Sequence, residues 1–487
     1  MSGTTRAPGS PRDHGLPGGP RLAEFRTALD AARGSVFTRA ERIPLDALDR
    51  WSADPESGTI RHVSGKFFSV QGIDVTISTD GTTRRWHQPI ISQPEIGVLG
   101  ILVKEFDGVP HFLMQLKDEP GNINGIQLSP TVQATRSNYT RVHGGHAVPY
   151  LDYFLERARH RVIADVRQSE QGDWFLLKRN RNMIVETRGD VPPREGFHWL
   201  TIHQIHDLLD LDDMVNMDAR SVLSCLPLWE FVRASAGDER VNSVVDAWSK
   251  TGHRGLHDTA ELLSWITDAR TRTEVDVRNA PLDRLPHWRR GTEIISHESD
   301  RFFDVIGVRV EAGGREVAGW DQPMVAARHV GLVAFLVTYA DGVPHVLVGI
   351  RAEPGFADVA ELGPTVQCVP AEHERGHPEW PPFLDTVLSA PADRVLYDTT
   401  LSEEGGRFFH TRNRYLIVEV DSDVDHPGFR WMTLHQLAEL IHHSHYINVQ
   451  ARTLLACMAT LATTRETGSA GPRTPEPATT AGQGGGV

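Results

Sequence analysis

The sequence predicts an α+β fold that occurs twice in one chain, and three observations support this prediction. First, the chain has 487 residues, which gives room for two or three hydrophobic cores. Second, long tracts of the first half return in the second half in the same order. Third, strand-like alternation is bracketed by segments with helical periodicity in both copies. A repeat of roughly two hundred residues indicates a duplicated domain rather than a solenoid unit.

The repeated tracts cover almost the whole chain outside its ends. With the first-half copy before its second-half copy, they are KFFSVQGI (66–73) and RFFDVIGV (301–308), DGVPH (107–111) and DGVPH (341–345), PTVQ (130–133) and PTVQ (364–367), RNRNMIVE (179–186) and RNRYLIVE (412–419), FHWLTIHQI (197–205) and FRWMTLHQL (429–437), and VNMDARSVLSCL (215–226) and INVQARTLLACM (447–458). The offset between copies changes little, so insertions are few. We therefore predict two related domains, at residues 21–240 and 250–464, between disordered tails at residues 1–20 and 465–487.

Each element is predicted from its own pattern. Amphipathic helices are expected at residues 21–32 and 257–269, at the start of the two halves. Residues 65–78 alternate in the manner of a strand, and the apolar run at residues 96–103 fits a buried strand. The DGVP tract at residues 107–110 predicts the turn of a hairpin after that strand.

The rest of the first half follows the same logic. We expect a helix at residues 150–161, a hairpin around residues 169–172, and a strand at residues 183–186. Two helices then close the half, one from about residue 202 and one through residues 218–229. The second half repeats this order.

Composition argues against several classes of protein. The formal net charge is −14 and there is no long run of Lys and Arg, which argues against binding to a nucleic-acid backbone. Cys225 and Cys457 fall at the same repeat position in apolar segments that are predicted to be helical, so we predict that both are core residues. Because no apolar run reaches membrane-spanning length and no signal peptide is recognised, we expect a soluble, cytoplasmic protein.

The combination of repeated tracts resembles the NDP-hexose 2,3-dehydratases. It comprises PTVQ, RNR before an apolar strand that ends in Glu, a helix with W-[LM]-T-[IL]-H-Q-[IL], and a helix with N-x-x-A-R. The resemblance implies a tandem duplication of a Nudix-hydrolase-like domain. It also implies a lyase that removes water across C2 and C3 of dTDP-4-keto-6-deoxy-D-glucose. The product would be a 2,6-dideoxy-3,4-diketo sugar nucleotide, made in deoxysugar biosynthesis for a natural product such as an antibiotic.

The same resemblance implies further properties. No cofactor is expected, the protein is expected to be a homodimer, and its labile product is expected to pass to an NADPH-dependent 3-ketoreductase. No nucleic acid and no membrane is expected among the partners. Two alternative functions stay open at this point: a Nudix-type NDP-sugar hydrolase, and a non-catalytic module that binds a nucleotide sugar.

No metal site is predicted. A Nudix hydrolase holds a divalent cation with the carboxylates of an R-E-x-x-E-E helix. The corresponding tracts here, YLDYFLERARHRV (150–162) and PFLDTVLSAPADRV (382–395), lack three carboxylates on one helical face. The tract at residues 373–377 matches the HExxH zinc pattern, but neighbouring prolines and a glycine oppose the helix that this pattern needs.

The two halves differ most in the loop that follows PTVQ, and there we place the candidate active site. In the first half this loop is rich in hydroxyl, amide, guanidinium and imidazole groups, which suit sugar and phosphate oxygens. We expect Tyr139 and His143 to be the catalytic acid and base, with Lys117 or Arg136 facing the C4 oxygen of the substrate. A surface loop that satisfies its own turns is the alternative interpretation.

The candidate substrate-binding residues extend beyond this loop. Recurring arginines suit a diphosphate, and a tryptophan suits stacking on a pyrimidine base. The full set is Trp51, Thr135, Arg136, Ser137, Asn138, Tyr139, Ser169, Arg179, Trp288 and Arg351. As alternatives, the RNR arginines stabilise a hairpin or an interface, and the tryptophans cap the core. We interpret Asn216, Asp218 and Arg220 as a helix N-cap with an ion pair.

Overall fold

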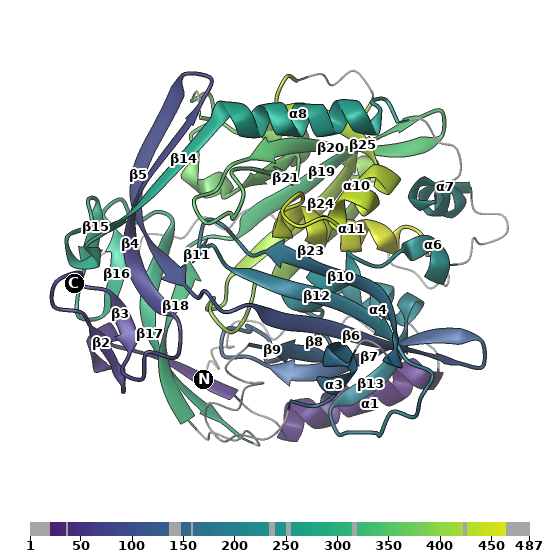
Figure 1. The fold of residues 1–487 in the computed structure, drawn as a ribbon, viewed down its shortest axis with the longest axis horizontal. Coiled ribbons are helices and arrows are strands. Elements are labelled where there is room, and N and C mark those ends of the chain that lie inside the picture. Colours follow the sequence, from purple (N-terminus) through teal and green to yellow (C-terminus); the bar gives the residue numbers. More distant parts are fainter. Residues whose placement is uncertain are drawn as a thin grey trace, which may run out of the picture.

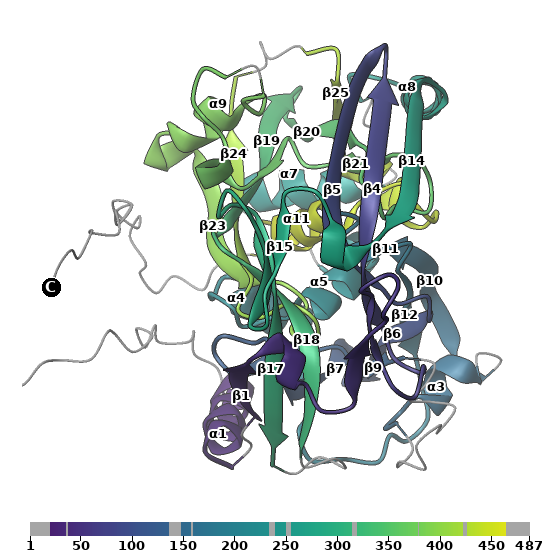
Figure 2. The same ribbon diagram turned by 90° about the vertical axis from the view of Figure 1, so that its left-hand side faces the viewer.

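Two large sheets lie on either side of buried helices, and two smaller sheets form one end of the molecule (Figures 1 and 2). This is a computed structural model, and the residues it describes are 20–35, 38–135, 148–156, 159–232, 239–249, 255–313, 319–377, 379–421 and 426–463. The predicted tails lie outside these ranges, apart from Pro20. In the described part of the chain, no helix is both long enough and apolar enough to cross a membrane.

The first large sheet contains seven strands of the first half. Its order is β10-β12-β6-β7-β13, with β8 paired to β7 and β9 paired to β6. The strands are β6 (Gly97–Phe106), β7 (Val109–Asp118), β8 (Ile126–Ser129), β9 (Val132–Ala134), β10 (Arg161–Ser169), β12 (Arg179–Glu186) and β13 (Phe197–Thr201). Strands β6 and β12 are parallel, and the other pairs are antiparallel.

The second large sheet has the same connections in the second half. Strand β19 pairs with β20, β22 and β24, as β6 pairs with β7, β9 and β12. The strands are β19 (Gly331–Ala340), β20 (Val343–Arg351), β21 (Glu361–Gly363), β22 (Val366–Cys368), β23 (Val395–Ser402), β24 (Arg412–Glu419) and β25 (Phe429–Thr433). Strands β19 and β24 are again parallel.

The two smaller sheets exchange their first strands. Strand β1 (Thr38–Ile43) pairs with β17 of the second half, and β14 (Thr273–Ala280) pairs with β4 of the first half. The other strands are β2 (Trp51–Ala53), β3 (Ile60–His62), β4 (Ser69–Thr79), β5 (Thr82–Ser92), β11 (Phe175–Leu176), β15 (Trp288–Arg290), β16 (Ile294–His297), β17 (Phe303–Ala312) and β18 (Gly319–Ala327). Each small sheet therefore needs a strand from the other half.

The repeated glycine of the VQGI and VIGV tracts explains how the exchanged strands fit. A Cβ on Gly72 would lie 2.6 Å from the carbonyl oxygen of Ala280, at the end of β14. A Cβ on Gly307 would lie 2.7 Å from the carbonyl oxygen of Ile43, at the end of β1. Both contacts are too close for any side chain, so glycine is required at the two equivalent positions.

Helices α5 and α11 pack against each other between the large sheets (Figure 2). The helices are α1 (Pro20–Ser35), α3 (Asp152–Leu155), α4 (Ile202–Leu209), α5 (Met217–Leu223), α6 (Leu228–Phe231), α7 (Glu239–Trp248), α8 (Thr259–Arg272), α9 (Leu384–Leu388), α10 (Leu434–Ile441) and α11 (Val449–Thr460). Short 3₁₀ helices occur at Leu45–Ala47, Leu282–Arg284, Pro370–Glu372 and Ala392–Arg394. One hydrophobic core joins strands and helices of both halves, and it includes Cys225 and Cys457, as predicted.

Most predicted elements of the first half are present, but two helix predictions were wrong in extent. Among the described residues of the helix expected at 150–161, the α-helical ones are Asp152–Leu155 (α3), and from Arg161 onward the chain pairs with β12 as strand β10, so tertiary pairing overrides local periodicity. The helix expected at residues 218–229 is interrupted after Leu223, where Pro227 precedes α6. Residues 373–377 are not helical, as predicted.

Candidate active site

A loop of each half is seated on a loop of the other half. The amide of Gly121 donates a hydrogen bond to the carbonyl of Gly405 at 2.7 Å, and the equivalent Gly355 donates to Gly172 at 2.8 Å. A Cβ on Gly121 would lie 1.9 Å from the carbonyl oxygen of Phe408, so this approach requires glycine. Side chains of both halves are therefore brought together at two equivalent places.

The first of these places holds a group of side chains that we call the first polar cluster. Lys117 Nζ lies 3.0 Å from Glu119 Oε1, and Gln133 donates to the same oxygen at 3.0 Å. The complete cluster is Lys117, Glu119, Gln133, Glu170, Lys178, Asp218, Glu404 and Arg407. Glu404 and Arg407 belong to the second half, so neither half holds the complete cluster.

Three carboxyl groups of the first polar cluster each have a buried, unsatisfied oxygen, and Glu404 as a whole is half-buried. Asp218 and Glu170 are each 3% exposed. Among the described residues, none hydrogen-bonds to Asp218 Oδ1, Glu170 Oε2 or Glu404 Oε2. In two of these carboxyl groups the other oxygen accepts a hydrogen bond: Glu170 Oε1 accepts from Asn180 at 2.7 Å, and Glu404 Oε1 accepts from the amide of Gly406 at 3.1 Å. A buried carboxyl with an unpaired oxygen favours its protonated form or a polar ligand.

Burial raises the pKa of all three carboxyl groups above the usual value. Burial raises the pKa of Asp218 well above its usual value, and the carboxylates of Glu170 and Glu404 raise it further. Burial, with the carboxylate of Glu119, raises the pKa of Glu404 to about 7. Burial lowers the pKa of Lys178, and Glu170 only partly offsets this effect. The cluster thus places proton donors beside an amine that loses its proton more readily than a lysine in water.

Two basic side chains of the cluster, Lys178 and Arg407, are fixed by contacts on their outer sides. Lys178 is 5% exposed and donates to the carbonyl of Glu95 at 2.5 Å. The Arg407 guanidinium lies 4.1 Å from the ring centroid of Phe68, and its Nε donates to Gln93 at 3.2 Å. Both side chains act on the pKa of Glu170 or Glu404, so they lie close enough to counter part of the acidic charge.

The equivalent place in the other half, the second polar cluster, repeats the geometry of the first. Its residues, in the same order, are Arg351, Glu353, Gln367, Glu403, Thr411, Gln450, Gln171 and Trp174. Arg351 Nε lies 3.4 Å from Glu353 Oε1, and Gln367 donates to that oxygen at 3.0 Å. Burial, with the neighbouring Asp173, raises the pKa of Glu353 to about 8.

The two clusters differ in charge at four equivalent positions. The first cluster is ionisable at all four and the second at none: the pairs are Lys178 and Thr411, Asp218 and Gln450, Glu404 and Gln171, and Arg407 and Trp174. The reverse occurs at Asp173, whose first-cluster equivalent is Gly406. Acid and base chemistry therefore has more candidate groups in the first polar cluster.

The structure places the predicted site residues in several environments. Lys117 and Arg351 lie in the first and second polar clusters respectively. Thr135 follows β9 and is half-buried. The remaining predicted residues of the loop after PTVQ lie in residues 136–147, outside the described residues: these are Arg136, Ser137, Asn138, Tyr139 and His143. Their roles stay predictions.

Four predicted substrate-binding residues lie outside both clusters. The indole N–H groups of Trp51 and Trp288 donate to backbone carbonyls of the opposite half, at 2.6 and 2.7 Å, and both rings pack in the core of the small sheets. Ser169 is completely buried between the halves, where its hydroxyl donates to Glu361. Arg179 begins β12. A role of these residues in substrate binding stays a prediction.

The second arginine of each RNR tract stabilises a hairpin, which is one of the alternatives considered for these residues. Arg181 makes two hydrogen bonds of 2.6 Å to Asp165 across β10 and β12. Arg414 makes the same pair of bonds to Asp398 across β23 and β24, at 2.8 and 2.7 Å. The bidentate geometry satisfies both carboxylate oxygens.

Sequence reasoning missed most of the first polar cluster. Asn216 caps α5 as predicted, because its Oδ1 accepts from the amide of Ala219 at 2.8 Å. The ion pair between Asp218 and Arg220 was wrong, because Arg220 donates to backbone carbonyls instead. The signal that could have found Asp218 was its replacement by Gln450 in the other copy.

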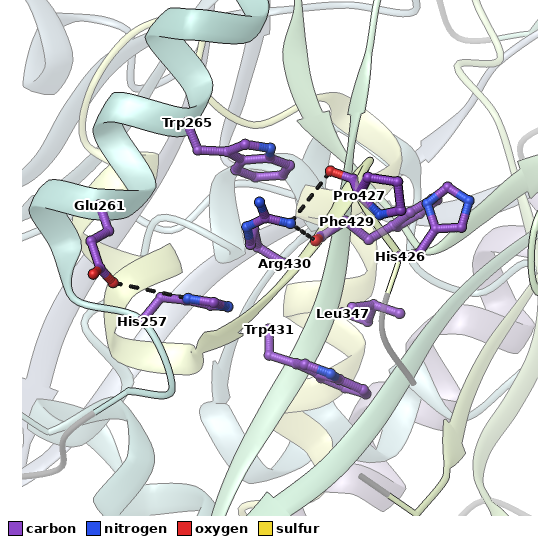
Figure 3. A pocket seen from close by; sticks show the side chains of 9 residues that line it. All are labelled: His257, Glu261, Trp265, Leu347, His426, Pro427, Phe429, Arg430 and Trp431. Carbon is purple, nitrogen blue, oxygen red and sulfur yellow. Dashed lines mark hydrogen bonds and ion pairs between the residues drawn. The ribbon is translucent and has the colours of Figure 1, made fainter. Parts of the chain in front are cut away.

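A cavity of about 540 Å³ lies elsewhere, between α8 and β25 (Figure 3). Its walls are aromatic, and the Arg430 guanidinium lies 5.2 Å from the ring centroid of Trp265. The lining residues are His257, Glu261, Trp265, Leu347, His426, Pro427, Phe429, Arg430 and Trp431, none of which belongs to either cluster. Among the described residues, no group of three or more His, Cys, Asp or Glu side chains is arranged to hold a metal ion.

Comparison with known proteins gives consistent matches along most of the chain. The family model described as NDP-hexose 2,3-dehydratase matches residues 22–226 and 259–458. The chain is similar to three proteins named dTDP-4-dehydro-6-deoxy-alpha-D-glucopyranose 2,3-dehydratase. It is 48% identical to the protein from Amycolatopsis orientalis, over 90% of each chain. It is 46% identical to that of Saccharopolyspora spinosa, over 90% of this chain and 91% of the relative. It is 50% identical to that of Streptomyces violaceoruber, over 88% and 96%.

Proposed function

This chain belongs to the NDP-hexose 2,3-dehydratase family, and we propose from this premise that it removes water across C2 and C3 of dTDP-4-keto-6-deoxy-D-glucose. The product is a 2,6-dideoxy-3,4-diketo sugar nucleotide. The observation that carries this proposal is the identity of 46% to 50% with relatives named for that dehydration, over both halves of the chain. The same names give no support to a hydrolase of NDP-sugars or to a binding module.

The substrate determines which groups the active site needs. The C4 ketone acidifies the proton on C3, so a base can remove that proton. The electrons of the C3–H bond then form the C2=C3 double bond while the C2–O bond breaks, and an acid gives its proton to the departing hydroxyl, which leaves as water. The resulting enol tautomerises by protonation at C2 and loss of the C3 hydroxyl proton. Atoms and electrons balance without an external oxidant or reductant.

We place this chemistry in the first polar cluster. Glu404 supplies the proton for the leaving hydroxyl, because burial raises its pKa to about 7. Lys178 removes the C3 proton, because burial lowers its pKa. Lys117 faces the developing charge on the C4 oxygen. The support for this placement is that Gln171 and Thr411, the equivalents of Glu404 and Lys178, can perform neither proton transfer.

The test compares Glu404→Gln with Gln171→Asn, its matched control in the second polar cluster. Substrate is incubated with each variant in deuterated water containing a chelator, and loss of substrate and uptake of deuterium are followed by NMR. Glu404→Gln should lower kcat by about 100-fold, whereas the control should stay within about 3-fold of wild type. Wild-type protein that consumes no substrate would refute the activity. Full activity in Glu404→Gln would refute only the placement.

We also propose that the halves arose by tandem duplication of a Nudix-hydrolase-like domain. The repeated sequence tracts and the equal pairing pattern of the two large sheets support this proposal. The other expectations from the family resemblance are retained as proposals too. They are a cytoplasmic homodimer that acts in deoxysugar biosynthesis for an antibiotic or similar natural product, and transfer of the product to an NADPH-dependent 3-ketoreductase.

A further inference from the structure

Arg220 is a completely buried arginine whose guanidinium joins the two halves. From helix α5, its Nη2 donates to the carbonyl of Ser402 at 2.6 Å, and its Nη1 donates to the carbonyl of Val215 at 2.5 Å. Its third contact is Thr453 of α11, at 3.5 Å from Nε. A buried guanidinium is costly unless its donors are satisfied, so these acceptors fix both the side chain and the backbone that they belong to.

The carbonyl that Arg220 holds lies directly before the loop that carries Glu404. Strand β23 ends at Ser402, and the loop then crosses to the first half. There Gly121 donates to the carbonyl of Gly405 and accepts from the amide of His410, at 2.7 and 2.9 Å. The loop is thus attached to the first half at its start by Arg220 and in its middle by Gly121.

Helix α5 places two different side chains with one backbone segment. Asp218 lies in the first polar cluster, and Arg220, two residues later, holds the strand end from which Glu404 departs. A rigid helix between them couples the position of the first-half acid to that of the second-half acid. Proton transfer is sensitive to displacements of about 1 Å, so such a coupling affects rate.

Arg452, on α11, makes the contacts that are equivalent to those of Arg220. Its Nη2 donates to the carbonyl of Ser169 at 2.6 Å, and its Nη1 donates to the carbonyl of Ile447 at 2.7 Å. It is also completely buried. The loop that it anchors carries Gln171 into the second polar cluster, while Glu170 is held separately by Asn180 on β12. Arg452 therefore offers a comparison with the same burial and chemistry, although its charge also acts on the pKa of Glu170 in the first polar cluster.

We infer that Arg220 is a positioning residue for catalysis: it fixes the second-half loop so that Glu404 meets Asp218 in the first polar cluster. This inference rests on the proposed function and on its placement in that cluster. Arg452 has the same structural role for the loop that carries Gln171 and Asp173 into the second cluster, and neither of these residues has a role in the proposed reaction.

The experiment compares Arg220→Lys with Arg452→Lys in the full-length protein. Both variants keep a positive charge but lose the planar fork, so both should lower Tm by similar amounts. Arg220→Lys should also lower kcat by about 30-fold with KM changed less than about 3-fold, whereas Arg452→Lys should lower kcat by less than about 5-fold, because Glu170 is not one of the groups that transfer a proton in the proposed reaction. In a Glu404→Gln background, Arg220→Lys should cause little further loss of kcat, because both changes act on one group.

If the protein does not fold with lysine at residues 220 and 452, a second pair of variants tests the same loops. A Cβ on Gly405 would lie 2.2 Å from Asn122 Oδ1, so Gly405→Ala displaces the same loop from outside the core. Gly172→Ala is its counterpart, with a Cβ 2.7 Å from the ring of Phe356. Gly405→Ala should lower kcat more than Gly172→Ala does, because Glu404 lies next to Gly405.

The possible outcomes separate the inference from the proposals beneath it. Equal losses of kcat in both arginine variants, in proportion to their loss of stability, would overturn the positioning role. A loss confined to Arg452→Lys would overturn the placement of catalysis in the first polar cluster, and the inference with it. Absence of turnover in the wild-type protein would overturn the activity itself.

Discussion

The two polar clusters share their backbone geometry and differ in their charge. Both are built by a glycine of one half that donates to a glycine of the other half, and both contain a basic residue beside a glutamate that accepts from a glutamine. At four further positions the first polar cluster is ionisable and the second is neutral. A shared scaffold therefore does not specify a reaction, and the side chains that differ between the copies carry the chemical information.

The largest expected effect comes from making the first cluster resemble the second at Lys178. We predict that Lys178→Thr lowers kcat by about 1,000-fold, because the equivalent threonine cannot accept the C3 proton. Steady-state kinetics with dTDP-4-keto-6-deoxyglucose measures this effect. Thr411→Ser, at the equivalent position, is the control and should leave kcat unchanged. A Lys178→Thr variant with more than a tenth of wild-type kcat would show that the base is another residue.

A smaller effect is expected from a second charge difference, at the junction of the halves. Glu361 is completely buried and accepts from the hydroxyl of Ser169, whereas its equivalent Gln127 accepts from Ser402 at 2.9 Å. Burial raises the pKa of Glu361 from 4.5 to about 7. Folding therefore favours the protonated form of Glu361. The contribution of Glu361 to the free energy of unfolding is complete below about pH 4.5 and is lost as pH rises through about 7.

We predict that Glu361→Gln stabilises the protein at pH 8 by up to about 3 kcal/mol, and changes stability little at pH 5. Urea unfolding at the two pH values measures the difference. The reciprocal Gln127→Glu should destabilise the protein at pH 8, because it buries a second carboxylate. Equal effects of Glu361→Gln at both pH values would show that titration of Glu361 does not contribute.

The smallest effect concerns pH and activity. The pKa of Glu404 is raised to about 7, and only its protonated form can donate to the leaving hydroxyl. We therefore predict a bell-shaped pH profile of kcat, in which activity falls at low pH as Lys178 gains a proton and at high pH as Glu404 loses its proton. A pH profile of kcat between pH 5.5 and about 9 tests this shape. A profile that stays flat through this range would remove Glu404 from the role of proton donor.

The sequence allowed much of the fold to be predicted because the repeated tracts coincide with its strands. Strands β1 and β14 were missed, because their sequences, TRAERI and TEVDVRNA, are largely polar and show only weak alternation of apolar and polar residues. Their exchange between the halves was not predictable either, since a strand pattern identifies a buried face but not a partner strand. The lengths of the helices after residues 150 and 218 depended on tertiary pairing and on Pro227.

The candidate site was harder to predict because its groups come from distant parts of the chain. Lys117 was identified, but Glu404 lies in a loop of the opposite half, and its approach to Asp218 depends on the contact between Gly121 and Gly405. Asp218 in the VNMDAR tract also has the pattern of an ordinary helix start, which hides its burial. A comparison of the two copies at every ionisable position would have identified all four positions at which the first polar cluster is ionisable and the second is neutral.

The exchange of β1 and β14 determines where hybrid proteins can be joined. A crossover between relatives near residue 250 would give each small sheet one strand from the wrong parent, because β14 follows that point but pairs with β4. A crossover after Ala280 keeps β14 with its partner β4 but leaves β1 facing a foreign β17. No single junction therefore transfers one half intact, so recombination between relatives is expected to require two junctions that move the first strands separately.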